Sequence, residues 1–231
     1  MTLKLGLPSK GRLMEKALDW FAQAEVTFRR TGSDREYAIE AAGLDGLQPV
    51  LLSAGEIPRE LAAGRIHLGV TGTDLVREKL ADWQNCVTEL KPMGFGKADL
   101  VLAVPAFWVD VDTLDDLDAV AARFRSRHGM RLRIATKYHR LVREHLRAFG
   151  VADYQLVDSQ GATEGTVAQG NAEAIADITS TGETLRANHL KALSDGPLHS
   201  SQATLFSSRR AGWATAQAPL EELSRRLVLE L

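Results

Sequence analysis

The segment Ala174-Ile-Ala-Asp-Ile-Thr-Ser-Thr-Gly-Glu-Thr-Leu-Arg-Ala-Asn188 decides the expected fold of this chain. Its apolar beginning, residues 174–178, is typical of a buried strand, and residues 183–188 are helix-forming. The turn between them contains Gly182, which lets a ligand approach the backbone closely. Hydroxyl side chains surround this glycine at Thr179, Ser180, Thr181 and Thr184. A strand that enters a helix through a short polar turn is the repeating unit of α/β folds.

Two interpretations of this loop remain open on the residues alone. In the first, amide N–H groups at the start of the helix and the hydroxyls around Gly182 bind an anion, as phosphate-binding loops do. In the second, a Ser or Thr simply caps the helix, which these residues do in many proteins. Four hydroxyls and a glycine within six residues are more than one cap requires. The anion-binding interpretation is therefore retained beside the capping one.

Similar strand–turn–helix patterns occur on both sides of residue 95. The other predicted strands are Leu3–Leu7, Val26–Phe28, Tyr37–Ala41, Val50–Ser53, a strand beginning at Ile66, Ala98–Val104, Leu132–Thr136, Tyr154–Val157 and Ala203–Ser207. The other predicted helices are Leu13–Ala24, Glu56–Gly64, Leu75–Ala81, Asp110–Arg127, Arg140–Phe149 and Pro219–Val228. Strands that alternate with helices in this way predict parallel βαβ units.

We therefore expect an α/β protein of two lobes, each a mostly parallel sheet flanked by helices. The composition changes near Lys91-Pro-Met-Gly-Phe-Gly96, which is the candidate crossing. Residues 1–94 and 195–231 are expected to form the first lobe, and residues 95–194 the second. Because open α/β sheets bind ligands at the carboxyl ends of their strands, we expect the active site in the cleft between the lobes.

Composition excludes several classes of protein. At 231 residues with a net charge of −2, the chain can bury a sizeable core and has no charge bias towards nucleic acid or an anionic membrane. The single cysteine, Cys86, excludes an internal disulfide and a cysteine zinc site, and it fits a reducing compartment. No stretch reads as a signal peptide or a membrane span. We expect a cytoplasmic protein with neither nucleic acid nor membrane as a partner.

Polar turns follow five of the predicted strands. They are Pro8–Arg12, Thr71–Asp74, Thr136–His139, Gly161–Glu164 and Thr179–Thr184. Amides, hydroxyls and cations are the groups that phosphate oxygens accept hydrogen bonds from, so the turns together favour a phosphorylated ligand. Lys10 and Arg12 are candidate contacts for it, or else two solvated charges beside a turn. His67 lies inside a strand and is interpreted as structural, and no nucleophile motif is present. The residues alone indicate a binder or transferase for phosphorylated small molecules.

Four segments of the chain resemble the conserved blocks of the ATP phosphoribosyltransferase family. They are Leu5-Gly-Leu-Pro-Ser-Lys-Gly-Arg-Leu13, Gly69-Val-Thr-Gly-Thr-Asp74, Arg133-Ile-Ala-Thr-Lys-Tyr138, and Gly161-Ala-Thr-Glu164 followed by residues 174–185. They occur in family order over residues 3–190. The chain resembles the short form, which lacks the C-terminal regulatory domain and works with a separate subunit related to histidyl-tRNA synthetase.

This resemblance implies a periplasmic-binding-protein-like two-lobed fold and the first reaction of histidine biosynthesis. N1 of the ATP adenine attacks the anomeric carbon of 5-phosphoribosyl 1-pyrophosphate, and N1-(5-phospho-β-D-ribosyl)-ATP and pyrophosphate are formed. The displacement is inverting and depends on Mg²⁺. The resemblance further implies a homodimer that assembles with the regulatory subunit into a hetero-oligomer.

Site residues follow from the same resemblance, position by position. Asp177, Thr179, Ser180, Thr181, Gly182, Glu183 and Thr184 match the phosphoribosyl pyrophosphate loop, with Asp177 near the ribose hydroxyls and residues 180–184 around the 5′-phosphate. Glu164 is expected at the ribose or the metal. Gly11, Arg12, Leu13, Gly72 and Asp74 match the ATP side, where Lys10 and Arg12 face the pyrophosphate. The expected catalytic residues are Lys10, Arg12, Glu164 and Asp177, and the resemblance does not assign the metal ligands.

One position departs from the family pattern. Many members have an arginine three residues before the acidic residue of an Asp-Ile-Pro motif, whereas this chain has Ser53 before Glu56-Ile-Pro58. Either a pyrophosphate-side cation is missing, or Arg30, Arg35 or Arg59 replaces it.

Two other functions compete with this one. A non-catalytic protein that binds an anionic solute would have the same two-lobed architecture, but it would carry an export signal. A purine-salvage phosphoribosyltransferase has a similar loop, but that loop usually carries two adjacent acidic residues, and Ala176 takes the place of the first here.

Overall fold

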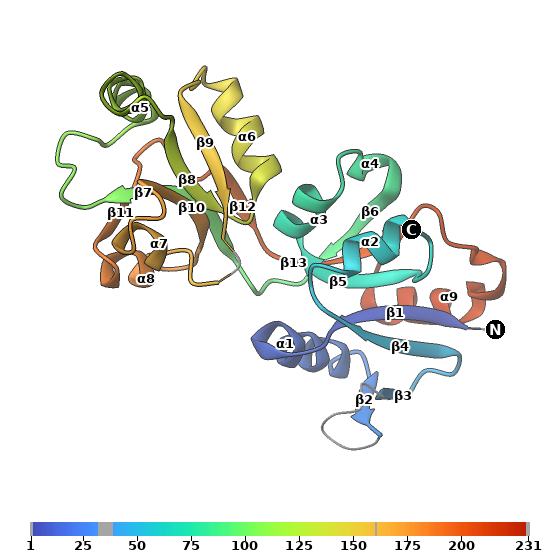
Figure 1. Ribbon diagram of the computed structural model, residues 1–231. Helices are drawn as coiled ribbons and strands as arrows, with labels where there is room; N and C mark the ends of the chain where they lie inside the picture. Colours follow the sequence, from blue (N-terminus) through green and yellow to red (C-terminus); the bar gives the residue numbers. More distant parts are fainter. Residues whose placement is uncertain (1, 32–38, 160, 230–231) are drawn as a thin grey trace. The chain divides into compact units, whose positions relative to one another are not determined.

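The computed structural model describes residues 2–31, 39–159 and 161–229 of the chain (Figure 1). The chain divides into two compact units. The first unit comprises Met1–Gly96 and Gln202–Leu231, and the second comprises Lys97–Ser201. The two-lobed α/β class is therefore confirmed. Our expected division put residues 195–201 in the first lobe, but His199–Ser201 pair with Leu100, Asp99 and Ala98 and so belong to the second unit.

The sheet of the first unit has the strand order β4-β1-β5-β13-β6. Its strands are β1 (Leu3–Pro8), β4 (Leu47–Leu52), β5 (Leu68–Gly72), β6 (Val87–Pro92) and β13 (Ala203–Ser208). β1 runs parallel to β4 and β5, whereas β13 runs antiparallel to β5 and β6. A separate hairpin joins β2 (Thr27–Arg30) to β3 (Ile39–Ala42).

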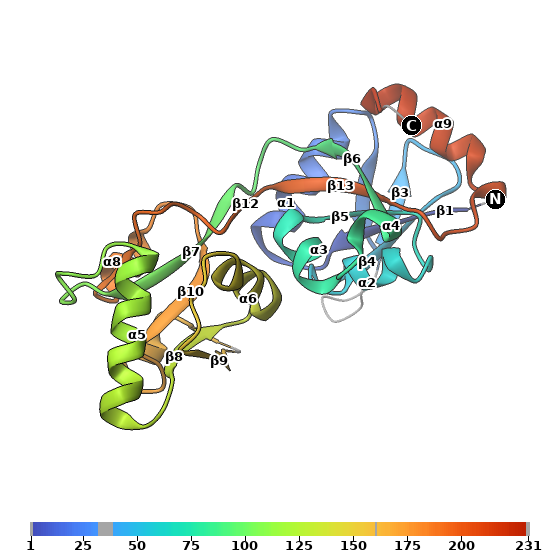
Figure 2. The ribbon, with the colours of Figure 1, turned by 90° about the horizontal axis from the view of Figure 1, so that it is seen from above.

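Two hydrophobic clusters hold helices to the two faces of this sheet (Figure 2). The helices are α1 (Gly11–Ala22), α2 (Ile57–Ala62), α3 (Thr73–Lys79), α4 (Trp83–Cys86), the 3-10 helix η1 (Trp213–Thr215) and α9 (Gln217–Leu227). Leu205 packs with α1 and α9, and its neighbour Phe206 packs with α2, α3 and α4, because successive strand residues point to opposite faces. Cys86 ends α4 and is buried there.

The second unit has a sheet in the order β11-β7-β10-β8-β9, with β12 also paired to β7. Its strands are β7 (Ala98–Pro105), β8 (Leu132–Thr136), β9 (Tyr154–Asp158), β10 (Ala174–Thr179), β11 (Leu190–Ala192) and β12 (His199–Ser201). Its helices are α5 (Leu114–His128), α6 (His139–Ala148), α7 (Gly165–Ala168) and α8 (Glu183–Ala187). β8, β9 and β10 are parallel, and Thr136 is in register with both Asp158 and Ala176. The carboxyl ends of these three strands therefore meet at one edge.

Both sheets are mixed, whereas the sequence predicted mostly parallel sheets. β7 runs antiparallel to β10, β11 and β12, and β13 runs antiparallel to both of its neighbours. A parallel neighbour requires a long crossover connection, usually a helix, and residues 193–202 form no helix before β13. The strands β6, β11 and β12 and the helix α4 were not predicted, because each has at most six residues and no strong apolar pattern.

Candidate functional site

The β10–α8 loop begins at a buried carboxylate. The Asp177 side chain is only 7% exposed, and its Oδ1 accepts a 2.8 Å hydrogen bond from the Ile178 amide. Lys137, which follows β8 directly, brings its Nζ within 3.4 Å of the same oxygen. The neighbouring parallel strands β8 and β10 thus deliver an acid and a base to the same edge. Such a pair orients Asp177 and leaves its second oxygen available to a ligand.

Hydroxyl groups shape the rest of this loop. Thr179 Oγ1 accepts the Gly182 amide at 2.9 Å, and Thr181 Oγ1 accepts the Glu183 amide at 3.3 Å. Gly182 has a φ of +72°, a left-handed conformation that favours glycine. Ser180 Oγ donates to the Lys97 carbonyl at 3.1 Å. The N-cap of α8 is Gly182, with no side-chain cap, so the simple interpretation of a Ser or Thr capping this helix is wrong. Thr179 and Thr181 instead accept amides within the turn, and Ser180, Thr181, Glu183 and Thr184 stay exposed.

The ends of β8 and β9 add further polar groups to this edge. Thr136 is fully buried, and its Oγ1 accepts the Tyr138 amide at 2.9 Å. His139 Nε2, at the start of α6, lies 3.2 Å from Oδ1 of Asp158, the last residue of β9. After β9, the Ser159 hydroxyl donates to the buried Thr163 hydroxyl at 3.1 Å. This bond supports the segment that leads to Glu164, which is half-buried at the start of α7.

Sequence reasoning did not single out Lys137 or Asp158 as site residues. The signal that could have found them is position, because each stands at the carboxyl end of a parallel strand beside β10 or β8. Lys137 lies within one of the five polar turns, but its ion pair with Asp177 joins residues that are far apart in the sequence.

In the first unit, the turns after β1, β4 and β5 lie at one edge of the sheet, because β1 is parallel to both neighbours. Lys10 precedes α1 in an extended conformation, Gly11 has a φ of +77°, and Lys10, Gly11 and Arg12 are exposed. Leu13 instead packs against the core. The edge thus presents the two cations to solvent while Leu13 anchors the start of the helix.

The β5–α3 turn lies beside them. Gly72 precedes α3, and Asp74 is 6% exposed in the first turn of that helix. Thr71 Oγ1 donates to the Ala54 carbonyl at 2.9 Å, which ties the end of β5 to the turn that follows β4. The structure brings Lys10, Arg12, Gly72 and Asp74 to one sheet edge.

Ser53 has a local structural use. Its amide donates to Glu56 Oε2 at 2.9 Å, and hydrogen bonds from the Ser53 side chain and backbone hold the pKa of Glu56 below its ordinary value. Of the arginines considered as replacements for a cation here, Arg59 is exposed on α2. The Arg30 side chain and all of Arg35 lie outside the described residues.

His67 has a structural environment, as the sequence predicted. Its Nδ1 accepts the Lys4 amide at 3.0 Å, and its Nε2 lies 3.3 Å from the Gly212 carbonyl. The ring also packs edge-on against Trp213, with the centroids 5.2 Å apart. Both ring nitrogens are thus used within the first unit.

In the described part of the chain, no helix is long and apolar enough to cross a membrane.

Comparison with known proteins identifies the family. The family model for HisG: ATP phosphoribosyltransferase matches residues 53–228. An ATP phosphoribosyltransferase of Cereibacter sphaeroides is 72% identical over 231 residues, covering 100% of this chain and 98% of that protein. One from Mesorhizobium japonicum is 49% identical and covers 97% of each chain.

Solved structures agree on the fold. The ATP phosphoribosyl transferase (HisG:HisZ) complex from Thermotoga maritima has a TM-score of 0.73 at 22% identity, covering 98% of this chain and 96% of that chain. The arginine-bound ArgBP from T. maritima has a TM-score of 0.53 at 14% identity, covering 98% and 95%. The likeness to a binding protein shows the fold alone. The family match and the full-length relatives confirm the resemblance, and the chain therefore belongs to the ATP phosphoribosyltransferase family, which joins ATP to phosphoribosyl pyrophosphate in the first step of histidine biosynthesis.

Proposed function

We propose that the chain carries out this reaction with phosphoribosyl pyrophosphate bound by the β10–α8 loop and ATP bound by the β1–α1 and β5–α3 turns. The observation that carries the proposal is the buried, oriented carboxylate of Asp177 at the start of a loop with exposed hydroxyls. The ribose 2- and 3-hydroxyls are hydrogen-bond donors, and a carboxylate is the natural acceptor for them. Glu164, half-buried beside the end of β9, is the second candidate for the ribose.

The 5′-phosphate is assigned to residues 180–184. Thr181 Oγ1 already accepts an amide hydrogen, yet its own hydroxyl proton remains available to a phosphate oxygen. Thr179 Oγ1 is placed in the same way by the Gly182 amide. Glu183 carries a negative charge, so its contribution to an anionic ligand is its backbone N–H and not its carboxylate. The loop is therefore held in shape by the same hydroxyls that would bind the phosphate.

On the ATP side, Lys10 and Arg12 supply the positive charge. Pyrophosphate leaves as the C1–O bond breaks, and the adenine N1 electron pair forms the new bond to C1. Negative charge grows on the departing oxygen, and a cation aimed at it stabilises the transition state more than the ground state. Gly11, Leu13, Gly72 and Asp74 then position the nucleotide, and the protein's main task is alignment of two polyanions.

Mg²⁺ fits this set of side chains. In the described residues, no group of three or more His, Cys, Asp or Glu side chains could hold a metal ion. Mg²⁺ is commonly bound through one or two carboxylates together with substrate phosphates, so such a cage is not needed. Asp177 and Glu164 are the carboxylates that we assign to it. When bound, Mg²⁺ would neutralise charge on the pyrophosphate.

We further propose a homodimer that assembles with a histidyl-tRNA-synthetase-like regulatory subunit, in the cytoplasm. The Thermotoga maritima structure is a HisG:HisZ complex by its own description, which supports a hetero-oligomer.

The deciding experiment measures pyrophosphate release from ATP, phosphoribosyl pyrophosphate and Mg²⁺, with and without the regulatory subunit. We expect turnover with ATP and none with free adenine or guanine. Turnover with a free purine base would favour the salvage enzyme, and tight binding of an anionic solute without any release would favour the binding protein.

The role of the cation on β1–α1 is tested by Lys10→Met. Loss of one donor aimed at the leaving group typically costs ~3 kcal/mol of barrier, so kcat should fall by about two orders of magnitude. Lys16→Met on the same helix is the matched control, because Lys16 is also exposed and lies away from the turn. Equal kcat values for the two variants would remove Lys10 from the catalytic set.

A further inference from the structure

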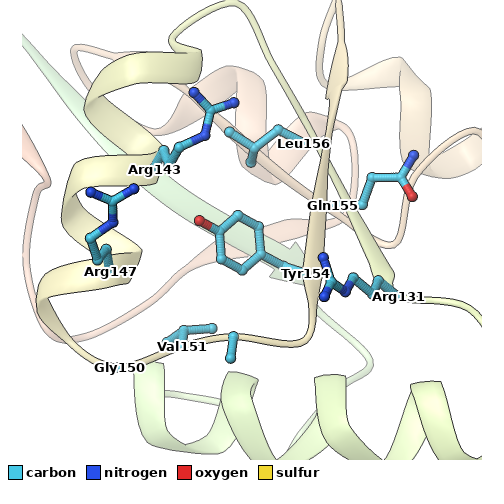
Figure 3. A pocket seen from close by; sticks show the side chains of 9 residues that line it. Arg131, Arg143, Arg147, Gly150, Val151, Tyr154, Gln155 and Leu156 are labelled. Atoms are coloured by element: carbon cyan, nitrogen blue, oxygen red, sulfur yellow. The ribbon is translucent and has the colours of Figure 1, made fainter.

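A cavity with three arginines in its lining lies in the second unit (Figure 3). It has a volume of about 650 Å³ and is lined by Arg131, Arg143, Arg147, Val151, Tyr154 and Leu156, among others. Arg131 directly precedes β8, and Tyr154 is the first residue of β9. The cavity is therefore at the amino ends of these strands, whereas every site residue proposed above in this unit follows a carboxyl end.

Three guanidinium groups line this cavity. Arg143 and Arg147 lie one turn apart on α6 and so share a helix face. Figure 3 shows the Tyr154 hydroxyl directed towards that helix, with Arg131 on the other side of the tyrosine. The cavity therefore combines three permanent cations with one hydroxyl.

Other arginines of this unit have carboxylate partners. Arg125, Arg133 and Arg140 each pair with a carboxylate, of Asp153, Glu173 and Glu144 respectively. Among the residues that the structure describes, none of Arg131, Arg143 and Arg147 has an ion-pair partner. The chain has 30 acidic residues for 28 basic ones, so carboxylates are not scarce. All three side chains are exposed, so water and salt screen part of their mutual repulsion, and a bound anion would lower what remains.

The helix dipole explains part of this arrangement. Arg147 is in the last turn of α6, where a cation is favourable without any ligand. Arg131 precedes β8 and is not on a helix, and Tyr154 is a neutral residue of β9, so neither is explained by the dipole of α6. The dipole therefore does not account for the convergence of residues from α6, β9 and the segment before β8.

We propose that this cavity binds a phosphorylated small molecule at a site separate from the substrate loops. Guanidinium groups match phosphate oxygens with two parallel hydrogen bonds, and a phosphate monoester carries nearly two negative charges against one for a carboxylate. The volume falls within the range of small-molecule sites, about 300–1,000 Å³, and exceeds what a bare phosphate needs. The Tyr154 ring, Val151 and Leu156 offer apolar contact to the organic part.

The test is a titration of the ¹⁵N-labelled full chain with ribose 5-phosphate at constant ionic strength, followed by NMR. The substrate loop is also expected to respond to this probe, and residue-resolved shifts separate the two sites. We expect saturable shifts at residues 150–156 and at the Arg143 and Arg147 side chains. In the Arg143→Gln/Arg147→Gln variant, the affinity calculated from these shifts should fall at least tenfold. The affinity calculated from the shifts of residues 179–184 should stay unchanged.

Arg123→Gln/Arg127→Gln is the matched control. Both residues are exposed arginines one turn apart on α5, so the control removes the same charge from the same unit. It should leave the affinity at residues 150–156 unchanged. Equal weakening by both variants would mean general charge attraction and would overturn the proposal. Citrate binding as tightly as ribose 5-phosphate would overturn the phosphate assignment, and binding of only a Glu-rich peptide would identify a protein docking surface instead.

Discussion

At the residue scale, the candidate site depends on a few side chains whose partners are remote in sequence. Asp177 is oriented by the amide of Ile178 on its own strand and by Lys137, which follows the neighbouring parallel strand β8. A buried carboxylate without such contacts would be costly, because burial penalises the charged form. Strand β10 thus sets the position of Asp177, and Lys137 after β8 offsets the cost of burying its carboxylate.

Gly182→Ala tests the loop backbone. A φ of +72° strains any residue with a Cβ, and that Cβ would lie 3.0 Å from Arg186 Nη1. We expect weaker binding of phosphoribosyl pyrophosphate by calorimetry, together with a stability loss of about 1 kcal/mol. Gly170→Ala is the control, since Gly170 has a φ of +71° and open space around it. It should show the stability loss alone, and unchanged binding in Gly182→Ala would exclude a ligand contact at this glycine.

At the scale of single elements, local capping determines where helices begin. The sequence predicted a helix from Asp110, but α5 begins at Leu114. Thr113 and Asp116 form a capping box in which the Thr113 hydroxyl accepts the Asp116 amide and the Asp116 carboxylate accepts the Thr113 amide. The Thr113 hydroxyl also donates to Asp116 Oδ2 at 2.7 Å, and this bond, followed by those from the Asp112 and Thr113 amides, lowers the pKa of Asp116.

Thr113→Ala should destabilise the chain by about 1 kcal/mol, because the N-terminal amides of α5 lose their cap. Chemical denaturation measures this difference. Thr113→Ser keeps the hydroxyl and should stay close to the wild type. If both variants lost the same stability, the cap would not be the cause.

Glu222 on the final helix, α9, should make the stability of the fold depend on pH. Hydrogen bonds from Arg225 and then Arg226 lower the pKa of Glu222 from 4.5 to about 2. A carboxyl whose pKa is lower in the folded state stabilises that state above its unfolded pKa, and this stabilisation is lost as the pH falls through the folded value. The Glu222→Gln variant should therefore be less stable than the wild type at pH 6, and the difference should shrink as the pH falls from about 4.5 towards 2. Thermal unfolding over this pH range measures this, and a pH-independent difference would contradict the ion-pair origin.

At the scale of the whole molecule, residues 202–229 are used to complete the first unit. β13 lies between β5 and β6, and Leu223 and Leu227 of α9 are buried in the core cluster that includes β1. The helical spacing of Leu220, Leu223 and Leu227 fits either the core or a partner surface. The burial of Leu223 and Leu227 assigns that face to the core.

We therefore expect the isolated chain to be insensitive to histidine acting at a distant site. Besides the proposed substrate turns, the two described units offer the arginine-lined cavity, which we assign to a phosphorylated molecule and not to histidine. Histidine titration of pyrophosphate release by the purified chain measures this, and inhibition should appear when the regulatory subunit is added. Strong non-competitive inhibition of the chain alone would reveal an allosteric site within these units.

The sequence by itself determined the βα units and supplied the candidate site residues. Residues 132–136 were predicted as a strand and form β8, and the predicted polar turns after β1, β5, β8 and β10 all follow strand ends. These features are local, because apolar periodicity and turn residues act within a few positions of the chain. The resemblance to the family added the roles that we propose for Asp177 and the loop hydroxyls, which composition and spacing did not supply.

Only the tertiary structure decided which strands are neighbours. β10 lies between β7 and β8, and this order makes the sheet mixed, brings Lys137 to Asp177 and places Asp158 at the same edge. It also gathers Arg131, Arg143 and Arg147 around Tyr154. Strand pairing joins segments that are distant in the chain, so its free energy comes from contacts between them. No local sequence pattern in either segment predicts which strands pair.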